Sequence, residues 1–175
     1  SYGPEARGGA AKADCVISDG AVDYPFVTEA DALVVLFQDA YTKFRPHMRE
    51  GGTLIVDADL VRPTDEDAED AIVIPAIRMA EELGSKIVAN IVMLGCLVGA
   101  TGIVSRESVQ EAIRSTVKEH VVELDLQALD AIRVGGAGAA DAAVAGHSPP
   151  EALAFTLALG CLVLPLHEQE MALTA

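Results

Sequence analysis

Short apolar runs alternate along this chain with longer stretches in which apolar and polar residues recur at helical spacing. The short runs are rich in Val, Ile and Leu, which is typical of strands covered on both faces. They predict strands at residues 13–18, 32–37, 53–56 and 71–74.

Helical segments fill the gaps between these strands, and the last of them continue the chain. They are expected at residues 38–49, 76–83, 87–101, 106–117 and 124–134. Gly51-Gly52 and Gly84 are expected to end the first two helices, and Ser105 to cap the fourth. Because strands alternate with helices, we predict an α/β domain with a mostly parallel sheet.

The C-terminal part has a different composition, which divides the chain into a domain at 1–134, a linker at 135–147 and a helical tail at 148–175. The linker is rich in Gly and Ala. Ser148 followed by two prolines and Glu151 resembles a helix start, so residues 152–166 are predicted to form an apolar helix that Pro165 brings to a close. Such a helix must pack on the domain or on a partner.

The charge balance limits the possible partners. The chain has 12 Lys and Arg against 27 Asp and Glu, a net charge of −15, and it has no Trp. Nucleic-acid binding needs clustered cations and stacking aromatics, so we expect none. The longest apolar run, residues 152–166, is shorter than the roughly 20 residues of a membrane span, and no secretory signal is visible, so no membrane association is expected.

The cysteines indicate neither a metal site nor a disulfide framework. Cys15, Cys96 and Cys161 lie far apart, and no C-x-x-C pair occurs. Cys15 and Cys96 fall in apolar runs and are predicted to be small core residues. We therefore expect a reduced, cytoplasmic protein without a metal of its own.

Two acidic features admit both a ligand-binding and a structural interpretation. Residues 65–70 carry five acids in six positions, and a solvated loop is favoured over a metal site. Asp57 follows a strand, where ligands gather in parallel sheets, but a loop cap is the favoured role. Neither feature, nor any of the four histidines, predicts a catalytic site.

The first nine residues, SYGPEARGG, form the most distinctive segment of the chain. Pro4 and the glycines exclude a helix or a regular strand, and Gly8-Gly9 permits positive φ and close approach to a neighbour. Arg7 offers a donor fork for phosphate or carboxylate. A binding loop and a plain surface turn are about equally favoured on this chemistry.

That segment, followed by ADCVIS at 13–18, EGGTLIVD at 50–57, LGSKIVAN at 83–90, MLG at 93–95 and TGIV at 101–104, resembles the gamma subunit of 2-oxoacid:ferredoxin oxidoreductases. This family acts on pyruvate, 2-oxoglutarate and 2-oxoisovalerate. The likeness covers roughly the first three quarters of the chain. Family members carry a further strand, a glycine-rich turn and a helix before SYGP, so the chain is expected to begin inside a longer protein and its sheet to lack a central strand.

The resemblance implies a Rossmann-like, three-layer subunit that is not active alone. Its enzymes decarboxylate a 2-oxoacid with thiamine diphosphate, transfer the acyl group to coenzyme A and pass electrons through iron–sulfur clusters to ferredoxin. These cofactors would lie in the assembled complex, with alpha and beta subunits as partners and a delta subunit left open. Ferredoxin, which is acidic, would dock on another subunit.

The resemblance also assigns candidate site residues, which would face the coenzyme A region or a subunit contact. They are Tyr2, Gly3, Pro4, Glu5, Arg7, Gly8, Gly9 and Asn90. Arg7 would contact a coenzyme A phosphate or a partner carboxylate, with Glu5 orienting it. The alternative, in which Glu5 and Arg7 form an ion pair that only fixes the shape of the loop, is about equally favoured. Asn90 is expected to hydrogen-bond inside the domain or at a subunit contact, and a direct ligand role is less favoured.

Three classes of function remain open. The first is the non-redox gamma subunit, with the beta-chain domain of an indolepyruvate (arylpyruvate) oxidoreductase as a close variant. The second is an independent nucleotide-binding enzyme, which would need a glycine-rich strand–helix turn that this sequence lacks. The third is a purely structural interaction module.

Overall fold

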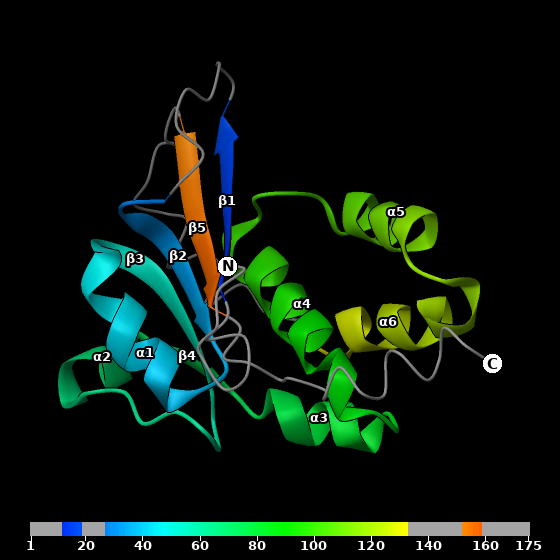
Figure 1. Cartoon of the computed structure of the whole chain (residues 1–175), viewed down its shortest axis with the longest axis horizontal. Coiled ribbons are helices and arrows are strands. Elements are labelled where there is room, and N and C mark those ends of the chain that lie inside the picture. The colour runs from blue at the N-terminus through cyan, green and yellow to red at the C-terminus, as the bar shows by residue number, and fades with distance from the viewer. Residues whose placement is uncertain (1–11, 19–26, 133–151, 159–175) are drawn as a thin grey trace, which may run out of the picture.

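The structure of the chain is a computed structural model that describes residues 12–18, 27–132 and, as backbone alone, 152–158. Its centre is a five-stranded sheet in the order β1-β5-β2-β3-β4 (Figure 1). The strands are β1 Ala13–Ser18, β2 Ala30–Val35, β3 Met48–Asp57, β4 Ile72–Ile74 and β5 Ala152–Ala158. All neighbouring strands pair in parallel except β1, which runs antiparallel to β5.

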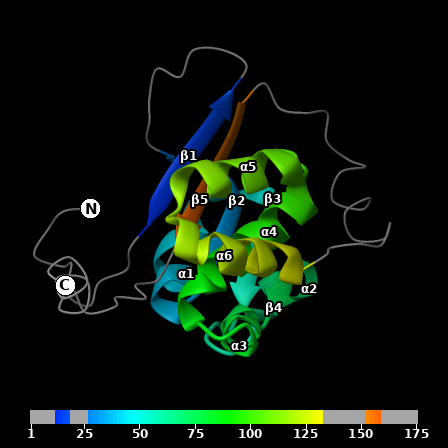
Figure 2. The same cartoon turned by 90° about the vertical axis from the view of Figure 1, so that its right-hand side faces the viewer.

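Helices cover both faces of this sheet (Figures 1 and 2). They are α1 Gln38–Phe44, α2 Asp65–Asp70, α3 Ala76–Glu82, α4 Ala89–Thr101, α5 Arg106–Thr116 and α6 Glu119–Ala131, with short 3-10 turns at Arg45–His47 and Lys86–Val88. α1 and α2 lie on one face, and α3, α4 and α6 on the other. The predicted three-layer α/β fold with a mostly parallel sheet is therefore confirmed.

The sheet has a hydrophobic core on each face, and alternate residues of β2 point into one or the other. Leu33 and Val35 pack with Tyr41 of α1, whereas Val34 packs with Val92 and other residues of α4. Such two-sided burial explains why the strand is apolar throughout. The strands predicted at 13–18, 32–37, 53–56 and 71–74 all exist, although β3 begins at Met48, five residues before its expected start.

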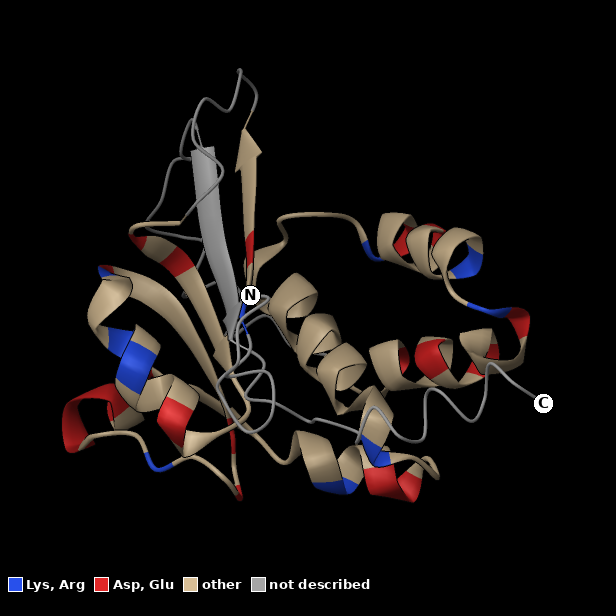
Figure 3. Cartoon of the chain, viewed as in Figure 1, with Lys and Arg blue, Asp and Glu red and all other residues tan. Residues whose placement is uncertain are grey.

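α4 is the buried central helix of the layer formed by α3, α4 and α6, and it carries no charged residue (Figure 3). It lies between the sheet and α6. At Gly95 the two helices come so close that an added Cβ would lie 2.5 Å from the Leu129 backbone oxygen. Glycine is required here because any side chain would push the helices apart.

Three of the five predicted helices, at 76–83, 87–101 and 106–117, match α3, α4 and α5 closely. Ser105 caps α5 as expected, and its hydroxyl accepts a hydrogen bond 3.1 Å from the Ser108 amide. α6 begins at Glu119, five positions before the predicted start at residue 124. Its first two residues, Glu119 and His120, are polar and exposed, and the half-buried Val121 and Val122 that follow were not recognised as part of the helix.

The prediction that a helix spans 38–49 and ends at Gly51-Gly52 is wrong. α1 ends at Phe44, and Pro46 lies in the 3-10 turn that follows, because proline cannot continue a helical hydrogen-bond ladder. Both glycines lie inside β3 instead. A Cβ on Gly52 would lie 2.8 Å from the Asp31 backbone oxygen, so this glycine lets β3 approach residue 31.

The predicted apolar helix at 152–166 is also wrong over its first half, where β5 spans Ala152–Ala158. Periodicity alone does not separate a buried strand from a buried helix in an apolar run, and here the length of the run favoured a helix. β5 lies between β1 and β2, where its backbone pairs on both sides. An interior position of the sheet that the sequence led us to expect empty thus holds a strand. The remainder of the tail and the linker at 135–147 lie outside the described residues.

The two cysteines with described side chains differ in environment. Cys96 of α4 is fully buried, and burial raises the pKa of its thiol to about 11. Cys15 is exposed, which corrects its prediction as a core residue. It lies on β1 at the edge of the sheet, where alternate residues face away from the protein. Among the helices between residues 38 and 131, none combines the length and hydropathy that a membrane span requires.

Candidate functional site

The site residues predicted from the sequence fall into two groups. Tyr2, Gly3, Pro4, Glu5, Arg7, Gly8 and Gly9 lie outside the described residues. Asn90 is the second residue of α4 and is half-buried. Its Oδ1 accepts a hydrogen bond 2.9 Å from the Ile91 amide. Asn90 thus makes a bond within its own helix, and its role toward a ligand stays a prediction.

Asp57, at the carboxyl end of β3, is fully buried. Its Oδ1 accepts hydrogen bonds from the amides of Asp59 at 2.9 Å and Leu60 at 3.1 Å. Its Oδ2 accepts one from the Ile77 amide at 3.2 Å, in the first turn of α3. The favoured interpretation of Asp57 as a cap is confirmed, because both oxygens hold backbone amides that would otherwise lack partners. Asp57 ties the end of β3 to the start of α3.

A second buried carboxylate, Asp67, was missed by the sequence analysis. Residues 65–70 form helix α2 instead of the solvated loop we expected, and Asp67 is 8% exposed. Arg45 binds it with Nε at 2.7 and 2.8 Å and with one terminal nitrogen at 2.5 Å. The Tyr41 hydroxyl also donates to Asp67. The five acids of this segment look alike in sequence, and only the packing of α2 beside α1 selects one for burial.

These contacts shift the pKa values of Asp67 and Arg45 so that both side chains stay ionised. The hydrogen bond from Arg45 holds the pKa of Asp67 below its ordinary value, against the opposing effect of burial. The same bond raises the pKa of Arg45. Across residues 12–18 and 27–132, no three His, Cys, Asp or Glu side chains lie close enough together to hold a metal ion.

Replacing Asp67 with Asn should lower the free energy of unfolding at pH 7 by about 1–3 kcal/mol, because Arg45 loses its charged acceptor. Since the folded pKa of Asp67 lies below its unfolded value of about 3.9, its contribution is complete above that pH and is lost as the pH falls through the folded pKa. Urea unfolding of both proteins from pH 7 to pH 2.5 should therefore show the difference shrinking in acid. Glu66→Gln, an exposed neighbour, is the control, and a pH-independent difference for Asp67→Asn would contradict the prediction.

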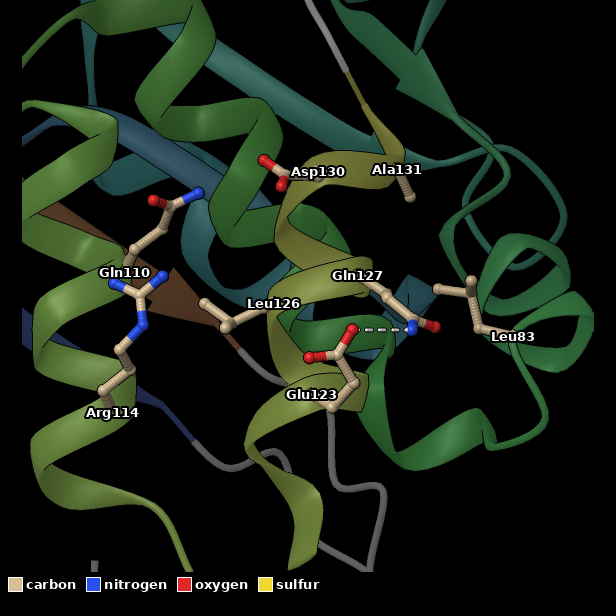
Figure 4. Close-up of a pocket in the computed structure, with 8 residues that line it drawn as sticks. All are labelled: Leu83, Gln110, Arg114, Glu123, Leu126, Gln127, Asp130 and Ala131. Carbon is tan, nitrogen blue, oxygen red and sulfur yellow. Dashed lines mark hydrogen bonds between the residues drawn. The ribbon is translucent and has the colours of Figure 1, made fainter. Parts of the chain in front are cut away.

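The outer helical layer carries an open groove of about 440 Å³ (Figure 4). α6 forms its floor, α5 one side, and the end of α3 the other. Its lining residues are Leu83, Gln110, Arg114, Glu123, Leu126, Gln127, Asp130 and Ala131. None of them is buried, and they come from three helices, so no local sequence pattern marked the groove.

Arg106 holds the two helices of this groove together. Its guanidinium donates to the Leu129 carbonyl at 2.8 and 2.9 Å and to the Ile132 carbonyl at 2.8 Å, at the C-terminal end of α6. These carbonyls lack partners within the helix, and a cation there also complements the helix dipole. α6 itself holds a third buried carboxyl, Asp125, whose pKa is raised by burial.

Comparison with known proteins places the chain in a family. Residues 1–134 match the family model described as pyruvate ferredoxin/flavodoxin oxidoreductase. The KorC subunit of 2-oxoglutarate synthase from Methanocaldococcus jannaschii is 49% identical over 132 residues, which are 73% of this chain and 70% of that subunit. The VorA subunit of ketoisovalerate oxidoreductase from Methanothermobacter marburgensis is 36% identical over 135 residues, 75% of this chain and 28% of that subunit.

A solved structure shows the same fold. The gamma subunit of a keto/oxoacid ferredoxin oxidoreductase from Geobacter sulfurreducens superposes with a TM-score of 0.57 at 33% sequence identity, covering 79% of this chain and 85% of that one. Sequence and structure thus agree on the family that the motifs of the first 104 residues suggested. The chain therefore belongs to the pyruvate ferredoxin/flavodoxin oxidoreductase family, as a gamma-type chain of the 2-oxoacid:ferredoxin oxidoreductases.

Proposed function

We propose that this chain is the non-redox gamma subunit of a 2-oxoglutarate:ferredoxin oxidoreductase, and that it supports the oxidative decarboxylation of 2-oxoglutarate to succinyl-coenzyme A in the cytoplasm. The choice of 2-oxoglutarate as the substrate rests on a difference in sequence identity between two relatives. The chain is 49% identical to a 2-oxoglutarate synthase subunit and 36% identical to a ketoisovalerate oxidoreductase subunit.

In this proposal the chain is a scaffold, and the redox cofactors belong to its partners. Iron–sulfur clusters need several cysteines at close spacing, and the sequence has three cysteines without a C-x-x-C pair. Thiamine diphosphate would lie between the alpha and beta subunits, and ferredoxin would dock on another subunit. A delta subunit remains an open partner. The −15 charge of this chain supports a docking site elsewhere, because it repels an acidic carrier.

The loop Tyr2–Gly9 is proposed to contact coenzyme A or an adjoining subunit. The support is chemical: Arg7 suits phosphate and carboxylate equally, and Gly8-Gly9 lets the backbone approach closely. Arg7→Ala separates the two. If added coenzyme A restores the activity of the assembled enzyme, the loop contacts coenzyme A. If the subunits separate, the loop is an interface element.

The decisive experiment is affinity purification of the tagged chain from its native cells, followed by viologen reduction with coenzyme A and a panel of 2-oxoacids. We expect larger subunits to co-purify, and reduction to be fastest with 2-oxoglutarate. Preference for pyruvate, 2-oxoisovalerate or indolepyruvate would overturn the substrate assignment. A chain that recovers no partner and no activity would overturn the proposal as a whole.

A further inference from the structure

The groove between α5, α6 and α3 has the geometry of a docking surface. Its volume of about 440 Å³ would suit a small ligand, but small-molecule sites enclose most of their ligand, and here every lining side chain is at least partly exposed. The α6 positions in the lining recur at spacings of three and four residues, so they form one stripe along the helix. An elongated occupant that follows this stripe fits better than a compact one.

Arg114 is the cation among the residues that line the groove. Of the acids in the lining, Asp130 lies 3.5 Å from Arg106, whereas Glu123 accepts a hydrogen bond from the neutral Gln127 amide at 3.1 Å and keeps its charge. Within the described part of the chain, the Arg114 guanidinium has neither a hydrogen bond nor an ion pair. It projects from α5 beside Gln110 and lies to the left of Leu126 in this view (Figure 4). An arginine in this state matches a carboxylate, which can accept two parallel hydrogen bonds.

The groove also offers an apolar surface beside Arg114. Leu126 lies at the centre of the groove, and Leu83 closes the side opposite Arg114 (Figure 4). Both are half-buried. An apolar floor with a polar rim is the arrangement by which helical grooves hold an amphipathic helix.

We propose that this groove docks an amphipathic helix of a partner subunit, with an apolar side chain on Leu126 and an Asp or Glu paired with Arg114. The inference rests on the proposed function, which supplies the partner subunits. A second copy of this chain is a poorer occupant, because two chains of net charge −15 repel each other. The ion pair between the partner's carboxylate and Arg114 is expected to fix the position of the partner helix along the groove.

The test uses the assembled complex. Tagged chains carrying Arg114→Glu are compared with wild type for the recovery of co-purifying subunits and for the dissociation constant of the complex. Lys43→Glu is the matched control, because Lys43 is an exposed residue of α1 on the other side of the sheet and undergoes the same charge change. We expect Arg114→Glu to weaken assembly by about tenfold or more, and Lys43→Glu to leave it unchanged.

A photo-crosslinking amino acid in place of Gln127 identifies the occupant. The expected crosslink joins a helical segment of a partner subunit, and reversing the acid of that segment to Lys should restore assembly of Arg114→Glu. A crosslink to a second copy of this chain would overturn the inference, as would wild-type assembly of Arg114→Glu with no crosslink. If the wild-type chain itself recovers no subunits, the proposed function fails and this inference with it.

Discussion

Gly95→Ala should destabilise the domain, although alanine is the better helix former. Position 95 lies in the interior of α4, where alanine would gain about 1 kcal/mol over glycine by helix propensity alone. The added Cβ, however, would lie 2.5 Å from the Leu129 oxygen and 3.2 Å from the Leu129 carbonyl carbon. Those atoms are backbone and cannot rotate away, so α4 and α6 must separate. We expect a net loss of about 1–3 kcal/mol in the free energy of unfolding.

Helix propensity and the contact with Leu129 predict opposite changes in the free energy of unfolding, so the sign of the measured change decides between them. Chemical unfolding followed by circular dichroism would give the difference from wild type, and Glu111→Ala on the exposed face of α5 is the control for an alanine substitution that meets no neighbouring helix. A Gly95→Ala protein as stable as wild type would show that α4 and α6 do not pack this closely. Because α6 also forms the floor of the groove, the same variant should weaken recovery of the partner subunits.

Asp57→Ala should have an effect at least as large. The substitution leaves the amides of Asp59, Leu60 and Ile77 without their acceptor at a fully buried position. Because Asp57 is fully buried, we expect a loss of about 2–4 kcal/mol. Asp57→Asn should recover part of it, because its single amide oxygen serves one side of the junction while its NH₂ opposes the Ile77 amide.

A neighbouring carboxylate provides the control for this prediction. Asp59 is paired with Arg78 at 2.7 Å, but its side chain is 43% exposed. Asp59→Ala should therefore change stability little, since exposed ion pairs contribute little. Equal effects of Asp57→Ala and Asp59→Ala in urea unfolding would contradict the role assigned to Asp57. Hydrogen exchange should further show that Asp57→Ala loosens the first turn of α3 before the rest of the sheet.

Local chemistry was a reliable guide wherever one residue type had a single low-energy role. Ser105 starts α5 because its hydroxyl satisfies an amide that the helix leaves open. Gly84 adopts a φ of 102° just after α3, as expected for a glycine placed beyond a predicted helix end. Asp57 had two possible roles in the sequence, and the favoured one, a cap, was correct.

Prediction failed where two local outcomes had similar energies. Residues 152–158 form a strand instead of a helix because strand pairing on both sides outweighs the local signal of Ser148 and its prolines. Cys15 is exposed because β1 lies at the edge of the sheet, which is a property of strand order. The helix expected to reach residue 49 shows a different fault, since the weight given to Gly51-Gly52 hid the earlier stop at Pro46.

The sequence by itself determined the family, the alternation of strands and helices and the helix ends at Ser105 and Gly84, because these depend on residues that are neighbours in the chain. Tertiary structure alone decided which of five similar acids in α2 is buried against Arg45, why residue 95 must be glycine, and which side chains meet in the groove above α6. The physical reason is that burial and close approach depend on the distance between elements far apart in sequence. That distance is set by the packing of the whole domain and is not encoded in any single segment.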